Sequence, residues 1–249
     1  METITSLKNP KVIAWKSLKD KKGREEHHAF LVEGDKMVRE ALASGLTVQA
    51  VLIREDLARE YLPLDHLPVP YVLPAHVFNA VCDTKTPQGI AAVVRMETRP
   101  ASGPRLLALD GVQDPGNVGT IVRTADAAGF DGVLFSRECA DLFSPKVLRA
   151  TMGSVFRLGF SFPASLPEAL EELKKKGYSV LSSQLDGDPF YERSGIAPSF
   201  VLVVGNEGNG ISDAVKAAAT HRLCLPMRGG AESLNAAVAA GIMMYDLTR

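Results

Sequence analysis

The sequence predicts an α/β protein whose main sheet is parallel and lies between two layers of helices. Short apolar segments of strand type alternate along the chain with segments of helical periodicity, and the alternation is most regular after residue 105. The chain has 249 residues, of which 46% are hydrophobic and 23% are charged. This length and composition allow one large domain or two small ones, each able to bury a core.

The N-terminal part of the chain, residues 1–97, is predicted to form a small α/β domain. Strands are expected at residues 30–34, 48–53 and 89–94, and helices at 35–44 and 75–82. The stretch METRPASGPR that follows holds Pro100, Gly103 and Pro104 close together, which is typical of a linker. A second domain is therefore expected over residues 105–249.

The second domain alternates strands and helices regularly. Strands are predicted at 105–111, 131–136, 178–184, 200–205 and 221–227, and helices at 117–129, 144–154, 167–177 and from Ala231 onward. The helix at 144–154 has a proline near its first turn, and the helix at 167–177 has acidic residues early and lysines late, as the helix dipole favours. This order predicts a parallel sheet with helices on both faces.

Three isolated cysteines, Cys82, Cys139 and Cys224, argue against a zinc site and against a disulfide framework. The first residues, METITSLKNPK, lack the apolar core of a signal peptide, and no apolar run reaches the length of a membrane span. The sequence therefore predicts a cytoplasmic protein that binds no metal and no membrane. Because the net charge is −1, any basic surface must be local.

Residues 1–24 carry such a local excess of positive charge. They contain Lys8, Lys11, Lys16, Lys19, Lys21, Lys22 and Arg24 against Glu2 and Asp20. The segment is either a solvated helix face or an arm that contacts phosphates. If the segment is an arm that contacts phosphates, the expected contacts are Lys8, Lys11, Lys21, Lys22 and Arg24. The single tryptophan, Trp15, is expected to pack in the core rather than to stack on a base.

Unusual polar residues follow three of the predicted strands, at the edge where an open parallel sheet binds its ligands. After the strand at 105–111, Asn117 stands where a helix begins, and Arg123 lies within that helix. A role as helix cap is sufficient to explain Asn117 alone. Arg123 has apolar neighbours in the helix, so an anionic partner is expected for it.

The strand at 200–205 runs into a glycine-rich loop, with Glu207 among Gly205, Gly208 and Gly210. Glycine lets a ligand approach the backbone closely. The glycine spacing matches neither the Walker loop nor the GxGxxG dinucleotide motif. By itself this loop is compatible with a ligand contact and with an ordinary capped turn.

The strand at 221–227 is followed by two glycines and by a helix that opens with polar residues. Ser233 and Asn235 are expected in the first turn, whose free N–H groups favour acceptors. One apolar stripe of this helix consists of Leu234, Val238, Gly241, Ile242 and Tyr245. A helix that is apolar all round is buried or shared with a partner. A core helix with a serine cap explains the alanines but not the polar cluster at one end.

Three ordered segments resemble the motifs of the SPOUT superfamily, and more specifically the SpoU/TrmH RNA 2′-O-ribose methyltransferases. They are NVGTIVRTADAAGFDGVL, VVGNEGNGIS and LPMRGGAESLNAAVA, within residues 105–249. Residues 1–95, with KNPKV, FLVEG and TPQGIAAVV, resemble the family's ribosomal-protein-like substrate-binding domain. The resemblance implies a SPOUT domain with a deep trefoil knot, a small N-terminal RNA-binding domain, S-adenosylmethionine as cofactor, and a homodimer.

The resemblance also implies the site residues. Cofactor contacts are expected at Gly205, Leu225 and Leu234, largely through the backbone, with Met227 lining the same pocket. The family's polar residues, taken here as catalytic, correspond to Asn117, Arg123, Glu207, Ser233 and Asn235. Val-Ser often follows the last asparagine in the family, whereas Ala236-Ala237 follow it here. This difference affects only local packing.

The implied reaction transfers a methyl group to a ribose 2′-oxygen of RNA, and the alignment of the two reactants does most of the work. Because a guanidinium stays protonated, we expect Arg123 to grip an RNA phosphate rather than to act as a base. Glu207 is expected to order two loops by accepting hydrogen bonds from Asn117 or the backbone. Ser233 and Asn235 are expected to orient the ribose or the loop around the methyl donor.

Ribosomal RNA is the expected substrate, by analogy with the N-terminal domain, and transfer RNA is the alternative. Two further classes stay open from the residues alone. A Rossmann-like nucleotide-dependent enzyme is suggested by the loop at 205–210, although no acidic ribose reader follows the strand at 221–227. A catalytically inactive RNA-binding protein would keep the basic arm but has no use for the polar residues at the strand ends.

Overall fold

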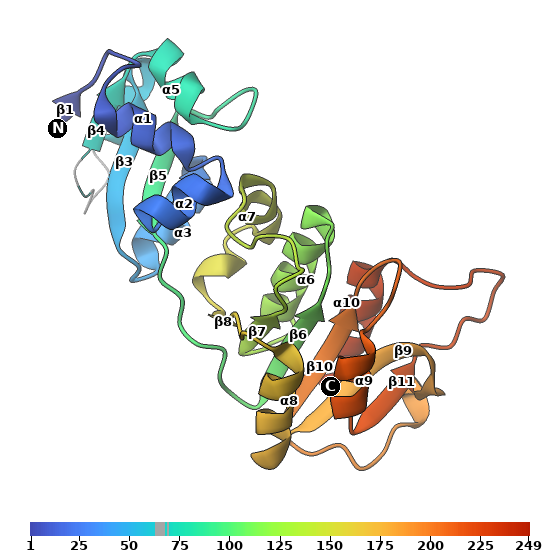
Figure 1. Cartoon of the computed structure of the whole chain (residues 1–249). Coiled ribbons are helices and arrows are strands. Elements are labelled where there is room, and N and C mark those ends of the chain that lie inside the picture. The colour runs from blue at the N-terminus through green and yellow to red at the C-terminus, as the bar shows by residue number, and fades with distance from the viewer. Residues whose placement is uncertain (63–67, 69) are drawn as a thin grey trace. The chain divides into compact units, whose positions relative to one another are not determined.

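The computed structural model describes residues 1–62, 68 and 70–249, which fold into two compact units (Figure 1). The first unit contains Met1–Glu97 together with Asp141–Arg157, and the second contains Thr98–Ala140 and Leu158–Arg249. The first unit is therefore built from two separate stretches of chain. The sequence pattern assigns the helix at 144–154 to the second domain, so its grouping with the first unit is a finding of the structure.

The sheet of the first unit is mixed, with strand order β1-β4-β3-β5-β2. Its strands are β1 (Glu2–Thr3), β2 (Ala29–Glu33), β3 (Val48–Arg54), β4 (Pro70–Leu73) and β5 (Ile90–Arg95). Strand β4 is parallel to β1 and β3, whereas β5 is antiparallel to β3 and β2. The helices of this part are α1 (Pro10–Ser17), α2 (Lys21–His27), α3 (Asp35–Ala43), α4 (Ala58–Tyr61) and α5 (Ala75–Val81). The predicted N-terminal α/β domain is confirmed.

Helix α1 shows how the sequence positions the core of this unit. Asn9 precedes the helix, its side chain accepts a hydrogen bond from the Lys11 N–H, and Pro10 occupies the first turn. The helix buries Val12 and Trp15. The Trp15 ring meets the ring of Tyr71 edge to face, with centroids 5.0 Å apart. The expectation that Trp15 packs in the core is confirmed.

The segment Asp141–Arg157 contributes to the core of the first unit. It contains α7 (Pro145–Thr151) and the 3₁₀ turn η2 (Ser154–Phe156). Phe143 and Phe156 pack on Phe30 of β2, with ring centroids 4.9 and 6.5 Å from that of Phe30. Because the Phe30 side chain is fully buried, removing the segment would expose an aromatic ring to water.

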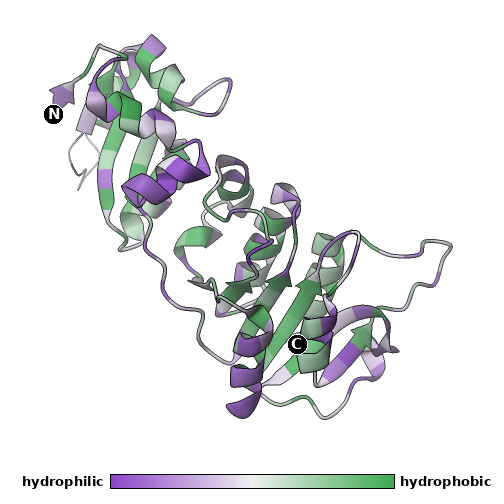
Figure 2. Ribbon diagram, in the orientation of Figure 1, coloured by the Kyte–Doolittle hydropathy of each residue, from purple (hydrophilic) through white to green (hydrophobic). Residues whose placement is uncertain are grey.

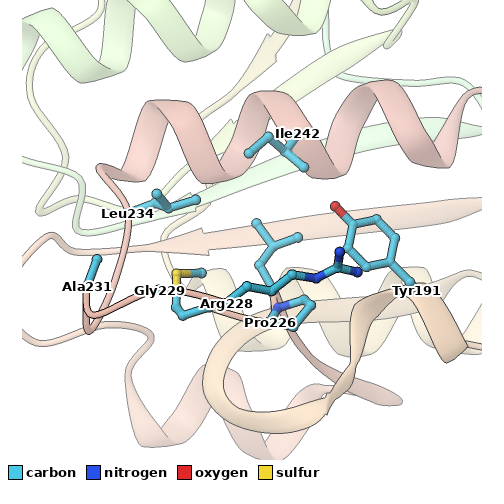
Figure 3. A pocket seen from close by; sticks show the side chains of 9 residues that line it. Tyr191, Pro226, Arg228, Gly229, Ala231, Leu234 and Ile242 are labelled. Carbon is cyan, nitrogen blue, oxygen red and sulfur yellow. The ribbon is translucent and has the colours of Figure 1, made fainter.

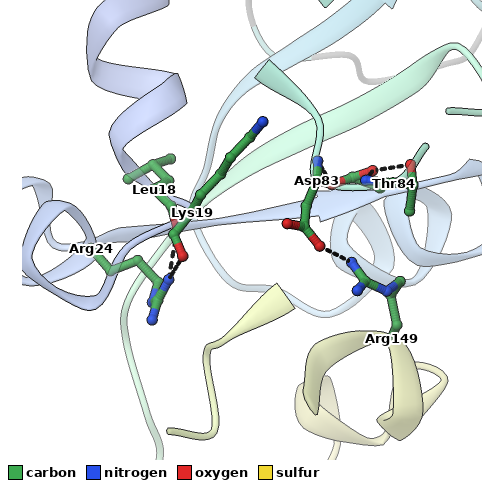
Figure 4. A network of polar contacts seen from close by, with 7 residues as sticks. Leu18, Lys19, Arg24, Asp83, Thr84 and Arg149 are labelled. Atoms are coloured by element: carbon green, nitrogen blue, oxygen red, sulfur yellow. Dashed lines mark hydrogen bonds and ion pairs between the residues drawn. The ribbon is translucent and has the colours of Figure 1, made fainter. Parts of the chain in front are cut away.

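Ion pairs add to these apolar contacts. Arg149 of α7 pairs with Asp83 at 2.8 Å, as Figure 4 shows, and Arg157 pairs with Glu40 at 2.5 Å. These four side chains are between about a third and about two fifths exposed, so each pair adds little stability by itself. The aromatic packing is therefore expected to stabilise this segment more than the ion pairs do.

Arg24 is buried, with 3% of its surface exposed, and its guanidinium is engaged inside the first unit (Figure 4). It donates to the backbone oxygens of Leu18 and Lys19 at 2.8 and 2.7 Å, and it pairs with Asp141 at 2.6 Å. The prediction that Arg24 contacts RNA is therefore wrong, because a buried and paired guanidinium cannot reach a phosphate.

The sheet of the second unit is parallel, with strand order β11-β9-β10-β6-β7-β8. Its strands are β6 (Arg105–Asp110), β7 (Gly132–Phe135), β8 (Gly159–Ser161), β9 (Ser179–Pro189), β10 (Phe200–Gly205) and β11 (His221–Cys224). The predicted parallel sheet is confirmed. β9 runs five residues beyond its predicted end at 184, and its extension pairs with β11 after a register shift.

Helices cover both faces of this sheet. They are α6 (Pro115–Ala127), α8 (Leu166–Lys175), α9 (Asp213–Ala218) and α10 (Ala236–Leu247). On one face, Leu170 of α8 and Val215 of α9 pack against Val201 and Val203 of β10. On the other face, α6 and α10 pack against each other (Figure 1). Figure 2 shows β10 and the middle of β6 as hydrophobic, as expected for strands buried on both faces.

Two helices begin elsewhere than predicted. Helix α10 begins at Ala236 rather than Ala231, because the Asn235 side chain accepts hydrogen bonds from the N–H groups of Ala237 and Val238 and thereby caps it. Helix α6 begins at Pro115, and its cap is Asp114. The cap interpretation of Asn117 is therefore wrong, which leaves the Asn117 side chain available for other contacts.

Candidate active site

Loops at the carboxyl edge of the second sheet carry the predicted polar residues. β6 and β10 are neighbours, and their last residues, Asp110 and Gly205, are register partners. The loops that leave them start side by side, and the Asn206 side-chain amide donates to the Gly111 oxygen at 2.8 Å. The Asp110 carboxylate accepts from the Ser212 N–H at 2.7 Å. These contacts fix the two loops against each other.

A chain of side-chain hydrogen bonds then joins three loops. Asn117 Nδ2 donates to Glu207 Oε1 at 2.9 Å, and Asn117 Oδ1 accepts from Asn235 Nδ2 at 3.0 Å. Each of the three residues comes from a different strand-end segment. The structure therefore brings together three of the five polar residues that the sequence indicated, and Glu207 accepts from Asn117 as expected.

Glu207 also holds the loop before α6. Its carboxylate accepts from the backbone N–H groups of Gln113 and Asp114, both at 3.4 Å. Partial burial raises the pKa of Glu207, but the hydrogen bonds from Asn117 and from the backbone outweigh it, so that the pKa lies below its ordinary value. Glu207 is therefore a carboxylate at neutral pH.

Asn235 has two functions at the start of α10. Its Oδ1 accepts from the Ala237 and Val238 N–H groups at 2.9 and 3.3 Å, while its Nδ2 donates to Asn117. Both ends of one side-chain amide are therefore used, which also fixes its orientation. This explains the polar group at the mouth of an otherwise apolar helix.

A cavity of about 590 Å³ adjoins these residues. All four predicted cofactor contacts line it, namely Gly205, Leu225, Met227 and Leu234. Glu207, Ser233 and Asn235 line it as well. Gly205 cannot carry a side chain, because a Cβ there would lie 2.4 Å from the backbone carbon of Gly210. The cavity has the size of a site for a small ligand, for which about 300–1,000 Å³ is usual.

A second opening of about 610 Å³ lies on the far side of Leu225, Met227 and Leu234, which line both spaces. Figure 3 shows Arg228 extending along this opening toward the ring of Tyr191, with Ile242 above them on α10. The two spaces thus share three apolar lining residues.

Arg123 and Ser233 lie outside the hydrogen-bonded chain. Arg123 is exposed on α6, and none of the residues that the structure describes gives it a hydrogen bond or an ion pair. The anionic partner expected for Arg123 is thus not found in the described chain. Ser233 lines the cavity with its side chain exposed and is likewise without a hydrogen bond to another described residue.

Sequence reasoning missed several contributors to the cavity and its frame, among them Asp186, Lys216 and Asp114. Asp186 and Lys216 line the cavity from β9 and α9, and no local pattern marks either residue. Asp114 caps α6 and accepts from the Asn117 N–H at 2.7 Å. Its position directly before Pro115 is a recognisable start signal for a helix, and this signal was available in the sequence.

The predicted RNA contacts Lys8, Lys21 and Lys22 are exposed on the first unit. Lys11 is partly exposed, donates to Glu2 and to the Tyr71 hydroxyl at 2.7 and 3.0 Å, and lies over the Tyr71 ring. These hydrogen bonds raise the pKa of Lys11 above its ordinary value. Its ammonium is therefore charged but partly engaged.

Two further features are absent from the part of the chain that the structure describes. It contains no cluster of histidine, cysteine or acidic side chains that would hold a metal ion. Within the same residues, no helix is both long and apolar enough to cross a membrane.

Comparison with known proteins identifies both parts of the chain. Residues 104–245 match the family model of the SpoU rRNA methylases, and residues 9–92 match the MRM3-like substrate binding domain. The chain is 42% identical over 248 residues to the 23S rRNA (guanosine(2553)-2′-O)-methyltransferase RlmP of Bacillus subtilis strain 168, covering 99% of each chain.

Solved structures agree with these matches. The AdoMet-bound rRNA methyltransferase from Sinorhizobium meliloti aligns with a TM-score of 0.86 at 30% identity, over 98% of this chain and 96% of that one. An RNA 2′-O ribose methyltransferase aligns with a TM-score of 0.79, also at 30% identity, over 98% of this chain and 97% of that one.

These matches favour an RNA methyltransferase over a Rossmann-like nucleotide-dependent enzyme and over an inactive RNA-binding protein. They confirm an RNA 2′-O-methyltransferase that uses S-adenosylmethionine and acts on ribosomal RNA. The sequence motifs, the fold and the strand-end site all agree with this result. The chain belongs to the SpoU rRNA methylase family.

Proposed function

We propose that this enzyme methylates the 2′-hydroxyl of a guanosine in 23S ribosomal RNA, at the point where the loops of Asn117, Glu207 and Asn235 meet. The Bacillus subtilis relative is named for that reaction and matches over almost the full length. The observation that carries the site is the hydrogen-bonded chain Glu207–Asn117–Asn235 beside the 590 Å³ cavity.

The cavity suits S-adenosylmethionine in size and in chemistry. Leu225, Met227 and Leu234 offer apolar contact to the adenine ring, and Gly205 offers its backbone. Glu207 supplies negative charge toward a cationic donor. When bound, S-adenosylmethionine supplies the methyl group on a positively charged sulfur. The residues of this chain would then hold the donor in place.

The Asn117 amide keeps the acceptor side of the site rigid. It donates to one loop and accepts from another, so neither loop moves without breaking a hydrogen bond. In a displacement whose rate depends on alignment, a rigid frame of this kind lowers the barrier. The Ser233 hydroxyl stands at the same cavity and is free to bond the ribose.

Arg123 grips the RNA phosphate next to the target ribose. Its guanidinium is exposed and has no ion-pair partner in the described chain, so it can form a bidentate contact with a phosphate. A guanidinium stays protonated, and the 2′-hydroxyl proton therefore leaves to water or to the phosphate.

The enzyme works as a homodimer in which α10 forms part of the interface. One face of α10 is buried through Ala237, Ala240, Met243 and Met244. The opposite stripe is apolar yet exposed in the single chain, with exposed fractions between 39% and 54%, and consists of Leu234, Val238, Ile242 and Tyr245. Contiguous apolar surface of this kind is typical of a protein interface.

The chain order around the site supports the trefoil knot implied by the family resemblance. The strand β11 lies at one edge of the sheet, and α10 then returns to pack on α6 and β10 near the middle. A crystal structure whose backbone trace could be pulled straight from both ends would contradict the knot.

The first unit binds the RNA, through the exposed side chains of Lys8, Lys21 and Lys22 and the partly engaged Lys11. Each phosphate that such a side chain neutralises adds salt-dependent affinity. Since ribosomal RNA is the proposed substrate, the enzyme acts in the cytoplasm.

Mass spectrometry of ribosomal and transfer RNA from cells with and without this protein tests the proposal. We expect the deletion to remove one 2′-O-methylguanosine from 23S rRNA, and the purified enzyme with S-adenosylmethionine to restore it. If the ribosomal RNA is unchanged, the proposal is wrong. Loss of a ribose methyl group from transfer RNA instead would favour that substrate.

A further inference from the structure

A further cavity, of about 460 Å³, opens at the same carboxyl edge of the parallel sheet. Asn206, Asn209 and Gly210 line both this space and the 590 Å³ cavity, so the glycine-rich loop is a shared wall. Its other walls come from the ends of β6 and β7 and from the residues that begin α8. None of the predicted cofactor contacts lines it. The cofactor site described above therefore leaves this cavity without a role.

The walls of this cavity are rich in groups that recognise a nucleobase. Gln113 and Asn209 bring side-chain amides, Arg137 a guanidinium and Glu138 a carboxylate. The side chains of Gln113, Arg137 and Asn209 have no hydrogen-bond or ion-pair partner among the residues that the structure describes. A hydrogen bond from the Ser136 hydroxyl lowers the pKa of Glu138, so its carboxylate is ionised at neutral pH.

Gly111 keeps the floor of this cavity open. It adopts a φ of +67°, and a Cβ placed there would point between Asn206 and Glu138, 3.8 and 3.9 Å from their Cβ atoms. A side chain at this position would be strained and would fill the space between the two. Leu166 and Pro167 add apolar contact, against which a flat ring can pack.

We propose that the 460 Å³ cavity holds the base of the nucleotide that is methylated, and that Glu138 reads this base as guanine. Guanine presents two donors, N1–H and the N2 amino group, on its Watson–Crick edge, and a carboxylate accepts both. Adenine presents an acceptor at N1, which an ionised carboxylate repels. The amides of Gln113 and Asn209 can then serve the remaining acceptors of guanine, O6 and N7. This inference rests on the proposed function.

The position of the cavity relative to the hydrogen-bonded chain supports this assignment. The Gln113 backbone N–H donates to Glu207, and the side chain of Gln113 lines the base cavity. A ribose at Asn117 therefore has the cofactor cavity on one side of the glycine-rich loop and the base cavity on the other. Proteins that recognise RNA sequence hold unstacked bases in such pockets and read their Watson–Crick edges.

The test compares full-length wild-type enzyme with Glu138→Gln on unmethylated 23S rRNA fragments that carry guanosine, inosine or adenosine at the target position. Glutamine keeps the shape of the glutamate side chain, but its single oxygen can accept a hydrogen bond from only one of the two guanine donors. Inosine lacks the N2 amino group. The matched control is Glu172→Gln, which removes an exposed carboxylate on α8, far along the helix from its start. The readouts are kcat/KM for each RNA and the Kd for S-adenosylmethionine.

We expect wild type and Glu172→Gln to prefer guanosine over inosine by about 10-fold and over adenosine by about 100-fold. Glu138→Gln should lose about 10- to 100-fold in kcat/KM on guanosine RNA and bring the guanosine-to-inosine ratio close to one. Its Kd for S-adenosylmethionine should be unchanged. If the variant is too slow for kinetics, the guanosine-to-inosine ratio is taken from the Kd values of the two RNAs, measured in the presence of S-adenosylhomocysteine.

Retention of the wild-type guanosine-to-inosine ratio in Glu138→Gln would overturn the inference, as would equal methylation of adenosine RNA by the wild type. Loss of S-adenosylmethionine binding in the variant would overturn it too, because the carboxylate would then act on the cofactor site. If wild-type enzyme methylates none of the ribosomal RNAs, it is the proposed function that fails.

Discussion

The Asn235 amide donates to Asn117 Oδ1 at 3.0 Å although 118 residues separate the two along the chain. The same Asn235 side chain caps α10 through its oxygen. The helix start and the proposed methyl-transfer site therefore share one amide, and a suitable pair of substitutions separates the two functions.

Asn235→Asp should keep the cap, because aspartate is as good an N-cap as asparagine, but it loses the donor to Asn117. We expect near wild-type stability with kcat/KM lowered about 10-fold or more, since one hydrogen bond of the frame is replaced by a repulsion between oxygens. Asn235→Ala should lose both functions and about 1 kcal/mol of unfolding free energy. Thermal unfolding and methyl-transfer assays measure the two effects. Full activity of both variants would remove Asn235 from the site.

The sequence predicted the convergence at the strand ends but only part of how the residues connect. The regular alternation of strand and helix segments predicted the parallel sheet. In any parallel sheet the carboxyl ends of the strands, here those of β6 and β10, lie at the same edge. The local pattern misassigned Asn117 as a cap, because Asp114 three residues earlier takes that role. The hydrogen bond from Asn117 to Glu207 agrees with the expectation, whereas the bond from Asn235 to Asn117 is seen only in the fold.

Arg24 and the segment Asp141–Arg157 show why the remainder was not predictable. Arg24 lies in a basic run, and a charge pattern contains no information about a partner 117 residues away. In the same way, the sequence of α7 predicts a helix, but it does not indicate which of the two units its buried face packs against. Long-range packing decided both cases.

Glu207→Gln tests whether the carboxylate holds the loops. The folded protein depresses the pKa of Glu207, so its stabilising effect is complete above the ordinary value of about 4.5 and is lost as the pH falls through the folded value. The melting temperature of wild type minus that of Glu207→Gln should therefore be largest above about pH 5 and shrink at lower pH. Glu26→Gln, an exposed change on α2, is the control. A difference that does not vary with pH would contradict this role.

Arg123→Lys keeps the positive charge but loses the planar guanidinium with its two parallel N–H donors. If Arg123 binds a phosphate through two parallel hydrogen bonds, kcat/KM should fall at least about 10-fold, while the Kd for S-adenosylmethionine stays the same. Steady-state methylation and calorimetric titration with the cofactor measure these quantities. Near-full turnover of the lysine variant would show that bidentate positioning is the wrong idea.

Ile242→Asp should convert the dimer into a monomer. Ile242 lies in the exposed apolar stripe of α10, and burying an unpaired carboxylate in the interface costs several kcal/mol. Sedimentation velocity measures the mass in solution. Ile13→Asp is the control, because Ile13 lies on α1 and is 57% exposed against 39% for Ile242, and it should leave the mass unchanged. A dimeric Ile242→Asp protein would place the interface elsewhere.

Arg24 is expected to stabilise the first unit and not to bind RNA. Arg24→Ala leaves Asp141 without its partner and opens space among buried groups, so the unfolding free energy should fall by about 3 kcal/mol. The slope of log affinity for RNA against log salt concentration should be unchanged, because the number of neutralised phosphates stays the same. The double variant Lys21→Ala/Lys22→Ala should do the opposite and lower that slope by about 2 with stability preserved. A shallower salt slope in Arg24→Ala at unchanged stability would mean that the guanidinium leaves Asp141 to meet the RNA.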